Sequence, residues 1–232
     1  MSDKHQDYIY INEDYYKNPK ESFTFLSNKI SQQYSNPTVL DLGCARGEFL
    51  YYLKNNINYK KLSGIDYSEQ LINEAKSFQG LNDVELHVGS ADDFHLNEKF
   101  DVIIMSGVLS YFDDIEKIFK LLKSHLSENG TILLFGLFNE YDVDILIKYR
   151  NNKYFNSFES GWNIHSIKTI QTILNKFNLK LISQDKFNLS FALEPQDDPC
   201  RSWHINTENG KKFTNGLNLI YDILLLEIKE QI

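Results

Sequence analysis

The sequence predicts an α/β fold, a three-layer sandwich in which helices cover both faces of a mostly parallel sheet. Three observations predict it. Short apolar, strand-like runs alternate with helix-like segments, a glycine-containing loop follows the first run directly, and acidic residues lie at the ends of the first two runs. Alternation of this kind is typical of parallel strands joined by right-handed crossovers. With 232 residues, 42% of them hydrophobic, the chain can form a single domain with a substantial core over residues 1–232.

The expected elements follow in order along the chain. Residues 1–36 are expected to form a helical cap, because Phe23, Leu26 and Ile30 have helical spacing before Asn36-Pro37 breaks the chain. Strands are expected near 38–42, 61–66, 84–88, 100–105 and 131–137, and helices near 47–55, 68–78, 114–126 and 166–177. Residues 179–183 and 219–228 resemble closing strands. Two long segments, 139–165 and 187–216, leave the ligand-binding edge of such a sheet and are expected to form a substrate lid.

The loop after the first strand is typical of a site for a nucleotide-like cofactor. Asp41 ends an apolar run, Gly43 and Gly47 follow, and a helix-like segment begins at once. Asp66, at the end of the second strand, lies 19 positions after Gly47, where a carboxylate can accept hydrogen bonds from both hydroxyls of a ribose. An acid two residues before the first glycine would repel a pyrophosphate, but it suits a ligand that carries an ammonium group.

This loop resembles the first motif of the class I S-adenosylmethionine-dependent methyltransferases, an acid-x-Gly-x-Gly-x-Gly sequence. The departure is Ala45 at the middle glycine, which is tolerated if its φ is negative. Further resemblance follows in chain order at residues 84–94, 100–109 and 127–135, so that it covers about residues 37–138. It implies the cofactor S-adenosylmethionine, the product S-adenosylhomocysteine, and a seven-stranded sheet of order 3-2-1-4-5-7-6 whose last strand is antiparallel.

The resemblance also implies the cofactor contacts. Asp41 and the loop would surround the methionine part, Asp66 would hold the ribose, Ser106 would offer its carbonyl to the ammonium, and Tyr15 or Tyr16 would close over the cofactor or simply pack on a helix. The implied cofactor-binding residues are Asp41, Gly43, Ala45, Gly47, Asp66, Tyr67, Ser90, Ala91, Asp92, Ser106 and Tyr16.

The candidates for catalysis and substrate binding lie in or beside the lid segments. His165 and His204 are candidate bases, because histidine accepts protons near neutral pH. Many members of the family that this chain resembles carry a histidine just after the fourth strand, where this sequence has Ser110-Tyr111, so Tyr111 is a further candidate. Trp162 and Arg201 are candidate substrate contacts, although an ion pair of Arg201 with Asp197 or Asp198 is an equal alternative. We expect no metal, because Asp113-Asp114 is better explained as a helix start.

The composition limits the partners. A net charge of −8 argues against nucleic-acid binding, and no apolar stretch is long enough for a membrane span. Two cysteines, Cys44 and Cys200, fit a reducing cytoplasm. We therefore expect a cytoplasmic monomer or homodimer that methylates a small molecule.

The first expectation for the reaction is O-methylation of a small polar metabolite. The lid pattern is similar to that of small-molecule methyltransferases from bacterial surface-polysaccharide pathways, which implies a sugar, a sugar nucleotide or a phosphorylated precursor. The alternatives are an N- or C-methyltransferase acting on another small molecule, and a binding protein that has kept the S-adenosylmethionine site but lost catalysis.

Overall fold

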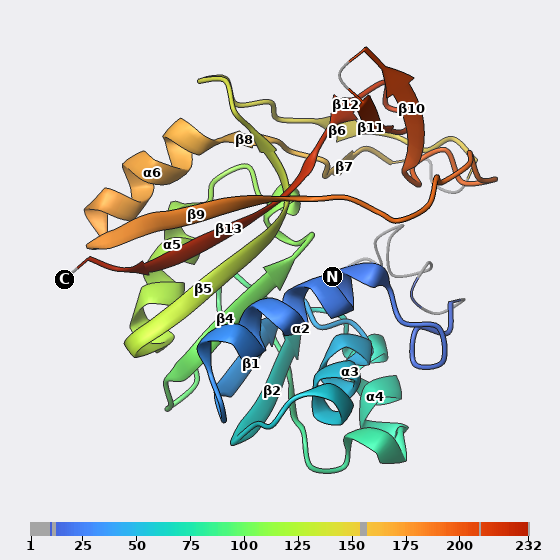
Figure 1. Ribbon diagram of the computed structural model, residues 1–232. Helices are drawn as coiled ribbons and strands as arrows, with labels where there is room; N and C mark the ends of the chain where they lie inside the picture. The colour runs from blue at the N-terminus through green and yellow to red at the C-terminus, as the bar shows by residue number, and fades with distance from the viewer. Residues whose placement is uncertain (1–9, 11–12, 154–156, 209, 232) are drawn as a thin grey trace.

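A twisted sheet lies at the centre of the molecule, and helices cover both of its faces (Figure 1). The computed structural model describes residues 10, 13–153, 157–208 and 210–231. The strand order is β3-β2-β1-β4-β5-β13-β9, with the two-residue strand β8 (His165–Ser166) paired to β5 as an eighth strand. The long strands are β1 (Thr38–Leu42), β2 (Lys61–Asp66), β3 (Glu85–Val88), β4 (Phe100–Ser106), β5 (Leu126–Asn139), β9 (Leu179–Phe187) and β13 (Ile223–Glu230).

The expected strand order is confirmed. Strands β1 to β5 are parallel to one another, whereas β13 is antiparallel to both β5 and β9. In chain order β9 is the sixth long strand and β13 is the seventh, which gives 3-2-1-4-5-7-6. The chain adds β2 and β3 on one side of β1, and then β4 and β5 on its other side. This reversal of strand order opens a crevice at the carboxyl ends of β1 and β4, which is where open α/β sheets bind ligands.

Each face of the sheet has its own core and its own helices. Helices α2 (Glu21–Gln33), α3 (Glu48–Asn56) and α4 (Glu69–Ser77) cover one face, and α5 (Glu116–His125) and α6 (Ile167–Lys176) cover the other. Phe23, Leu26 and Ile30 are buried on α2, as their helical spacing predicts. Ser166 begins α6 as expected, because its side chain accepts a hydrogen bond from the Thr169 amide.

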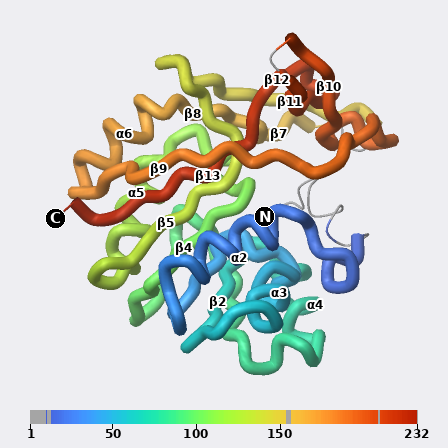
Figure 2. Tube along the Cα trace, viewed as in Figure 1, coloured from blue at the N-terminus to red at the C-terminus, as the bar shows by residue number. Residues whose placement is uncertain are grey.

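The two lid segments form small sheets of their own. Within the first segment β6 (Lys148–Tyr149) pairs with β7 (Glu159–Ser160). After the second segment leaves β9, β10 (Trp203–Thr207), β11 (Gly210–Thr214) and β12 (Ile220–Tyr221) form an antiparallel sheet. Figures 1 and 2 show both small sheets gathered beyond one end of the central strands, close to where α2 begins.

None of the helices in the described part of the chain has the length and apolar character that crossing a bilayer requires.

Candidate active site

The loop between β1 and α3 is a tight turn that only small residues can make. Gly43 and Gly47 have φ values of 80° and 76°. A Cβ on Gly43 would lie 2.2 Å from Cγ2 of Val108, and one on Gly47 would lie 2.8 Å from Cδ1 of Leu81. Ala45 also adopts a positive φ, 49°, so the condition under which an alanine is readily tolerated here is not met. The left-handed conformation costs an alanine free energy that a glycine would not lose.

Asp66 ties this loop to the end of β2. Its carboxylate accepts hydrogen bonds from the Ala45 amide at 2.8 Å and from the Ser68 amide at 2.9 Å, and the side chain is buried. The backbone adds two further bonds, because the Gly43 and Cys44 amides both donate to the Ile65 carbonyl. The acid at the end of β2 therefore fixes the shape of the glycine loop while it faces the neighbouring cavity.

A cavity of about 540 Å³ opens at the carboxyl ends of the central strands. Its walls come from the glycine loop, the end of β2, the segment after β3, the segment after β4 and the first lid. Of the expected cofactor residues, seven line it: Gly43, Ala45, Asp66, Tyr67, Ser90, Ala91 and Ser106. Tyr111 and Trp162 line it as well. Its size and its position beside β1, where the order of the strands reverses, suit a nucleoside-sized ligand.

Two smaller cavities adjoin the first. One of about 280 Å³ shares Gly43, Ala45, Ser106 and Trp162 with the large cavity and adds Asp41 to the wall. The other, of about 330 Å³, extends from Trp162 toward the second lid. The three cavities form a continuous series that runs from the end of β2, past the glycine loop, to the lid.

The other expected cofactor residues lie outside the walls of these cavities. Gly47 begins α3 behind the loop. Asp92 accepts a hydrogen bond from the Ser90 hydroxyl, so it supports the segment that lines the cavity. Tyr16 packs its ring against Phe78, with ring centroids 4.1 Å apart, and its hydroxyl donates to the Arg46 carbonyl. The structure thus gives Tyr16 the packing position that was the alternative to closing over a cofactor.

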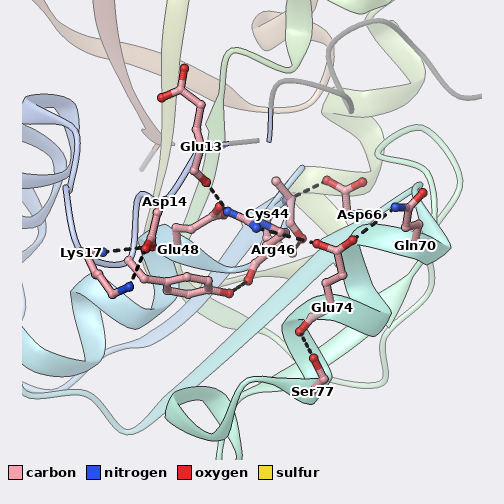
Figure 3. A network of polar contacts seen from close by, with 12 residues as sticks. Glu13, Asp14, Lys17, Cys44, Arg46, Glu48, Asp66, Gln70, Glu74 and Ser77 are labelled. Carbon is pink, nitrogen blue, oxygen red and sulfur yellow. Dashed lines mark hydrogen bonds and ion pairs between the residues drawn. The ribbon is translucent and has the colours of Figure 1, made fainter. Parts of the chain in front are cut away.

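Three buried carboxylates surround the glycine loop. Asp41, Glu48 and Asp66 are each less than 7% exposed. Burial, with the negative charges of Asp66 and Glu48 nearby, raises the pKa of Asp41 to about 7. Arg46 compensates part of this charge, since its Nε lies 3.0 Å from Oε1 of Glu48 (Figure 3). A cationic group of a ligand would compensate the rest.

The two candidate histidine bases are held by backbone groups. Nε2 of His165 lies 3.0 Å from the Phe112 carbonyl, and the side chain is 3% exposed. Nδ1 of His204 accepts from the Leu193 amide at 2.8 Å, and its ring packs against Phe213. Burial lowers the pKa of both imidazoles. Neither histidine lines any of the three cavities, so this geometry favours a role for both in holding the lid segments in place. Of the expected catalytic residues, Tyr111 lines the large cavity.

His165 belongs to a clamp between the first lid and the segment after β4. Asn163, fully buried, donates from Nδ2 to the Phe112 carbonyl at 3.1 Å and to the Asp113 carboxylate at 2.9 Å, while its Oδ1 accepts from the Ile147 amide. Asp113 accepts a further bond from Ser160. Asp114 accepts from the Glu116 amide at the start of α5, as expected for a helix start. Asp113 therefore holds the lid and Asp114 caps a helix.

Both expected substrate contacts line the cavities. Trp162 lines all three, adopts a φ of 61°, and has a buried Nε1–H without a hydrogen-bond partner among the described residues. Arg201 lines the cavity near the second lid. Its Nη2 pairs with Glu13 at 3.0 Å and contacts the Tyr15 hydroxyl at 3.2 Å. The side-chain partner of Arg201 is thus Glu13, and neither Asp197 nor Asp198 forms the expected ion pair with it.

Several residues that the structure brings to the site were not expected there. Tyr10 lines all three cavities, and Lys20 lines the two smaller ones. Ser202 and Tyr221, whose hydroxyls lie 2.6 Å apart, come from the second lid and from β12. Only the clustering of tyrosines before residue 17 could have drawn attention to Tyr10, and Lys20 is one lysine among many.

Comparisons with known proteins agree with this geometry. A family model described as a methyltransferase domain matches residues 11–184. The chain is 31% identical over 106 residues to the malonyl-[acyl-carrier protein] O-methyltransferase of Bacillus anthracis, a match that covers 46% of this chain and 39% of that protein. It is 30% identical over 142 residues to the tRNA U34 carboxymethyltransferase of Campylobacter hominis, or 59% of this chain and 47% of that protein. The chain thus spans less than half the length of these curated relatives.

Solved structures share the fold. A methyltransferase from Clostridium acetobutylicum ATCC 824, described as S-adenosylmethionine-dependent, superimposes with a TM-score of 0.61 at 15% identity, over 97% of this chain and 95% of that one. The glycopeptide N-methyltransferase MtfA, in complex with (S)-adenosyl-L-methionine, gives 0.60 at 14% identity, over 90% and 92%. The expected Rossmann-like fold is therefore confirmed. Because the family model covers more than half of the chain and includes the glycine loop and Asp66, this chain belongs to the methyltransferase-domain family.

Proposed function

We propose that this protein is an S-adenosylmethionine-dependent methyltransferase that transfers a methyl group to a small molecule. The observation that carries the proposal is the cavity at the carboxyl ends of β1, β2 and β4, with Gly43 and Ala45 of the glycine loop and Asp66 in its wall. Small residues at Gly43 and Ala45 let a ligand approach the backbone closely, and buried carboxylates can hold a ribose and an ammonium group. The residues present therefore fit this cofactor.

Within this proposal each acid has a separate task. Asp66 holds the ribose hydroxyls, and Asp41, on the wall of the adjoining cavity, faces the ammonium group together with the Ser106 carbonyl. Ser90, Ala91 and Tyr67 border the base. When bound, S-adenosylmethionine supplies an activated methyl group, so the protein has to position the acceptor in line, exclude water and accept a proton. Tyr111 and Trp162 are the side chains of the proposed site that lie on the acceptor side.

For the acceptor, we infer O-methylation of a small polar metabolite, such as a sugar, a sugar nucleotide or a phosphorylated precursor of a surface polysaccharide. The support is the pair of smaller cavities lined partly by the two lid segments, and two relatives, the Bacillus anthracis protein and the juvenile hormone acid methyltransferase of Bombyx mori, are O-methyltransferases by name. The two thiols, both buried and free, fit a cytoplasmic protein. We propose that it acts as a monomer or a homodimer.

Titration calorimetry tests the cofactor assignment. The expected result is saturable binding of S-adenosylmethionine and S-adenosylhomocysteine, with no heat from NADH under the same conditions. Absence of binding by both sulfur nucleosides would overturn the proposal. Release of S-adenosylhomocysteine during incubation with candidate acceptors then separates an enzyme from the alternative of a non-catalytic binding protein, and mass spectrometry of the product locates the new methyl group on oxygen, nitrogen or carbon.

A further inference from the structure

One positive charge in the acceptor region lacks a partner. The Lys20 ammonium lies 4.1 Å from the ring centroid of Tyr15, 4.7 Å from that of Tyr10 and 6.0 Å from that of Phe23. Among the described residues, no carboxylate lies within ion-pair distance of it and no hydrogen bond uses it. Lys29 shows the contrast, because its ammonium is 2.8 Å from Asp185 and 3.0 Å from Glu227.

The neighbouring charges do not satisfy this ammonium. Arg201 already pairs with Glu13 and holds the Tyr15 hydroxyl, so it fixes the ring over which Lys20 lies. Aromatic faces attract a cation, but they offer no acceptor for the three N–H donors of an ammonium. Burial lowers the pKa of Lys20 from its ordinary value, and Arg201 adds to this, whereas Tyr15, Glu48 and Glu13 oppose it. An anion placed beside Lys20 would restore the charged form and occupy its donors.

Lys20 lies on the wall of a space that a ligand can enter. It lines both smaller cavities, together with Ser22 and Ser202. One of these cavities joins the large cavity at Ser106 and Trp162, and the other has an apolar wall of Phe187, Leu189, Leu193 and Phe213. A molecule anchored at Lys20 can therefore lie against apolar side chains and extend its other end toward the proposed methyl donor.

We propose that Lys20 binds an anionic oxygen group, a carboxylate or a phosphate, of the methyl acceptor. The inference rests on the proposed methyltransferase function and narrows its substrate to an anionic member of the proposed class, part of which can lie against apolar side chains. Because the cavity of about 280 Å³ also has Asp41 and Glu48 in its wall, the anion is assigned to the cavity of about 330 Å³, which Lys20 lines without these two acids.

Three eight-carbon probes test the inference on the full chain saturated with S-adenosylhomocysteine: octanoate, octyl phosphate and the neutral octanamide. Binding is followed by calorimetry and by the fluorescence of Trp162 and Trp203. We expect at least one anion to bind roughly 10- to 100-fold more tightly than octanamide, as for a charged hydrogen bond. The tighter of the two anions identifies the group. Equal binding of all three probes, or no binding of either anion at millimolar concentration, would overturn the inference.

Three variants locate the effect. Lys20→Met keeps the stem but not the charge and should abolish the preference for the anion, whereas Lys20→Arg should retain most of it. Lys17→Met is the matched control, since Lys17 lies in the same segment with 84% of its side chain exposed. A preference that survives in Lys20→Met, with thermal unfolding and S-adenosylhomocysteine affinity unchanged, would refute the role of Lys20. If the unchanged protein does not bind S-adenosylhomocysteine at all, the proposed function is refuted instead.

Discussion

The cofactor side and the acceptor side of the site are built in opposite ways. On the cofactor side, three acids and a strained loop come from β1, β2 and the start of α3, within about 30 residues of one another, and hydrogen bonds from the Ala45 and Ser68 amides fix Asp66. On the acceptor side, Tyr10 and Lys20 meet Trp162, Arg201 and Tyr221 from the far end of the chain. Local geometry determines the first side, and tertiary packing determines the second.

The two sides also differ in charge. The cofactor side concentrates buried carboxylates, of which Asp41 has a pKa raised to about 7. On the acceptor side, Lys20 has no ion-pair partner among the residues that the structure describes, whereas Arg201 pairs with Glu13. Buried charges are costly unless a partner compensates them. The difference therefore indicates that each side is completed by a ligand of opposite sign, and the following changes test this for each side.

The largest effect is expected at Asp66. Asp66→Ala removes the acceptor of the Ala45 and Ser68 amides together with the proposed ribose contact. We expect S-adenosylhomocysteine affinity to fall by about 1.5–3 kcal/mol, roughly 10- to 100-fold. Calorimetry measures it, and Asp93→Ala, an acid 71% exposed beyond the cavity, is the control. Equal affinities of Asp66→Ala and the unchanged protein would exclude Asp66 from the cofactor site.

The next effect concerns the lid. Asn163→Ala leaves the Ile147 amide, the Phe112 carbonyl and the Asp113 carboxylate with one partner fewer. Of these groups only the partly buried Ile147 amide is left without its partner, because Phe112 keeps His165 and the exposed Asp113 keeps Ser160, so the free energy of unfolding in urea should fall by about 1–3 kcal/mol. Asn152→Ala, at an exposed position in the same segment, should change it by less than about 0.5 kcal/mol. If the clamp serves only the acceptor side, Asn163→Ala should bind S-adenosylhomocysteine within about twofold of the unchanged protein. A large loss of affinity in this variant would show that the two sides are not independent.

A pH titration tests the acidic side. Since the pKa of Asp41 is about 7 in the folded protein and 3.8 ordinarily, its contribution to stability is present below pH 4 and is lost as the pH rises through 7. A bound ammonium favours the carboxylate, so S-adenosylhomocysteine binding should release protons and tighten from pH 6 to pH 8, by at most about tenfold per pH unit. Asp41→Asn should remove both dependences. Proton uptake on binding to the unchanged protein would contradict the charge assignment.

These differences explain how far the sequence predicted the molecule. The glycine loop was predictable, because Asp41, Gly43 and Asp66 form a pattern that local backbone geometry requires, whereas the strand order followed only from the resemblance to the class I methyltransferases. The lids were predicted as segments only, since the pairing of β10, β11 and β12 depends on contacts with distant elements. The Arg201 to Glu13 ion pair joins residues 188 positions apart, and the burial of Lys20 arises from aromatic residues that pack around it. Such contacts leave no periodic signal in the sequence.

The smallest effect is expected at Ala45, where an alanine replaces the middle glycine of the motif and adopts a positive φ. Its φ of 49° costs an alanine about 1–2 kcal/mol, whereas glycine adds about 0.4–1 kcal/mol of entropy to the unfolded chain. Ala45→Gly should therefore stabilise the protein by up to about 1 kcal/mol in urea unfolding. Ala75→Gly, inside α4, should destabilise it by about 1 kcal/mol as the control. If both variants lose stability, Ala45 is not strained in solution, and the cofactor side would be less rigidly preformed than the loop geometry indicates.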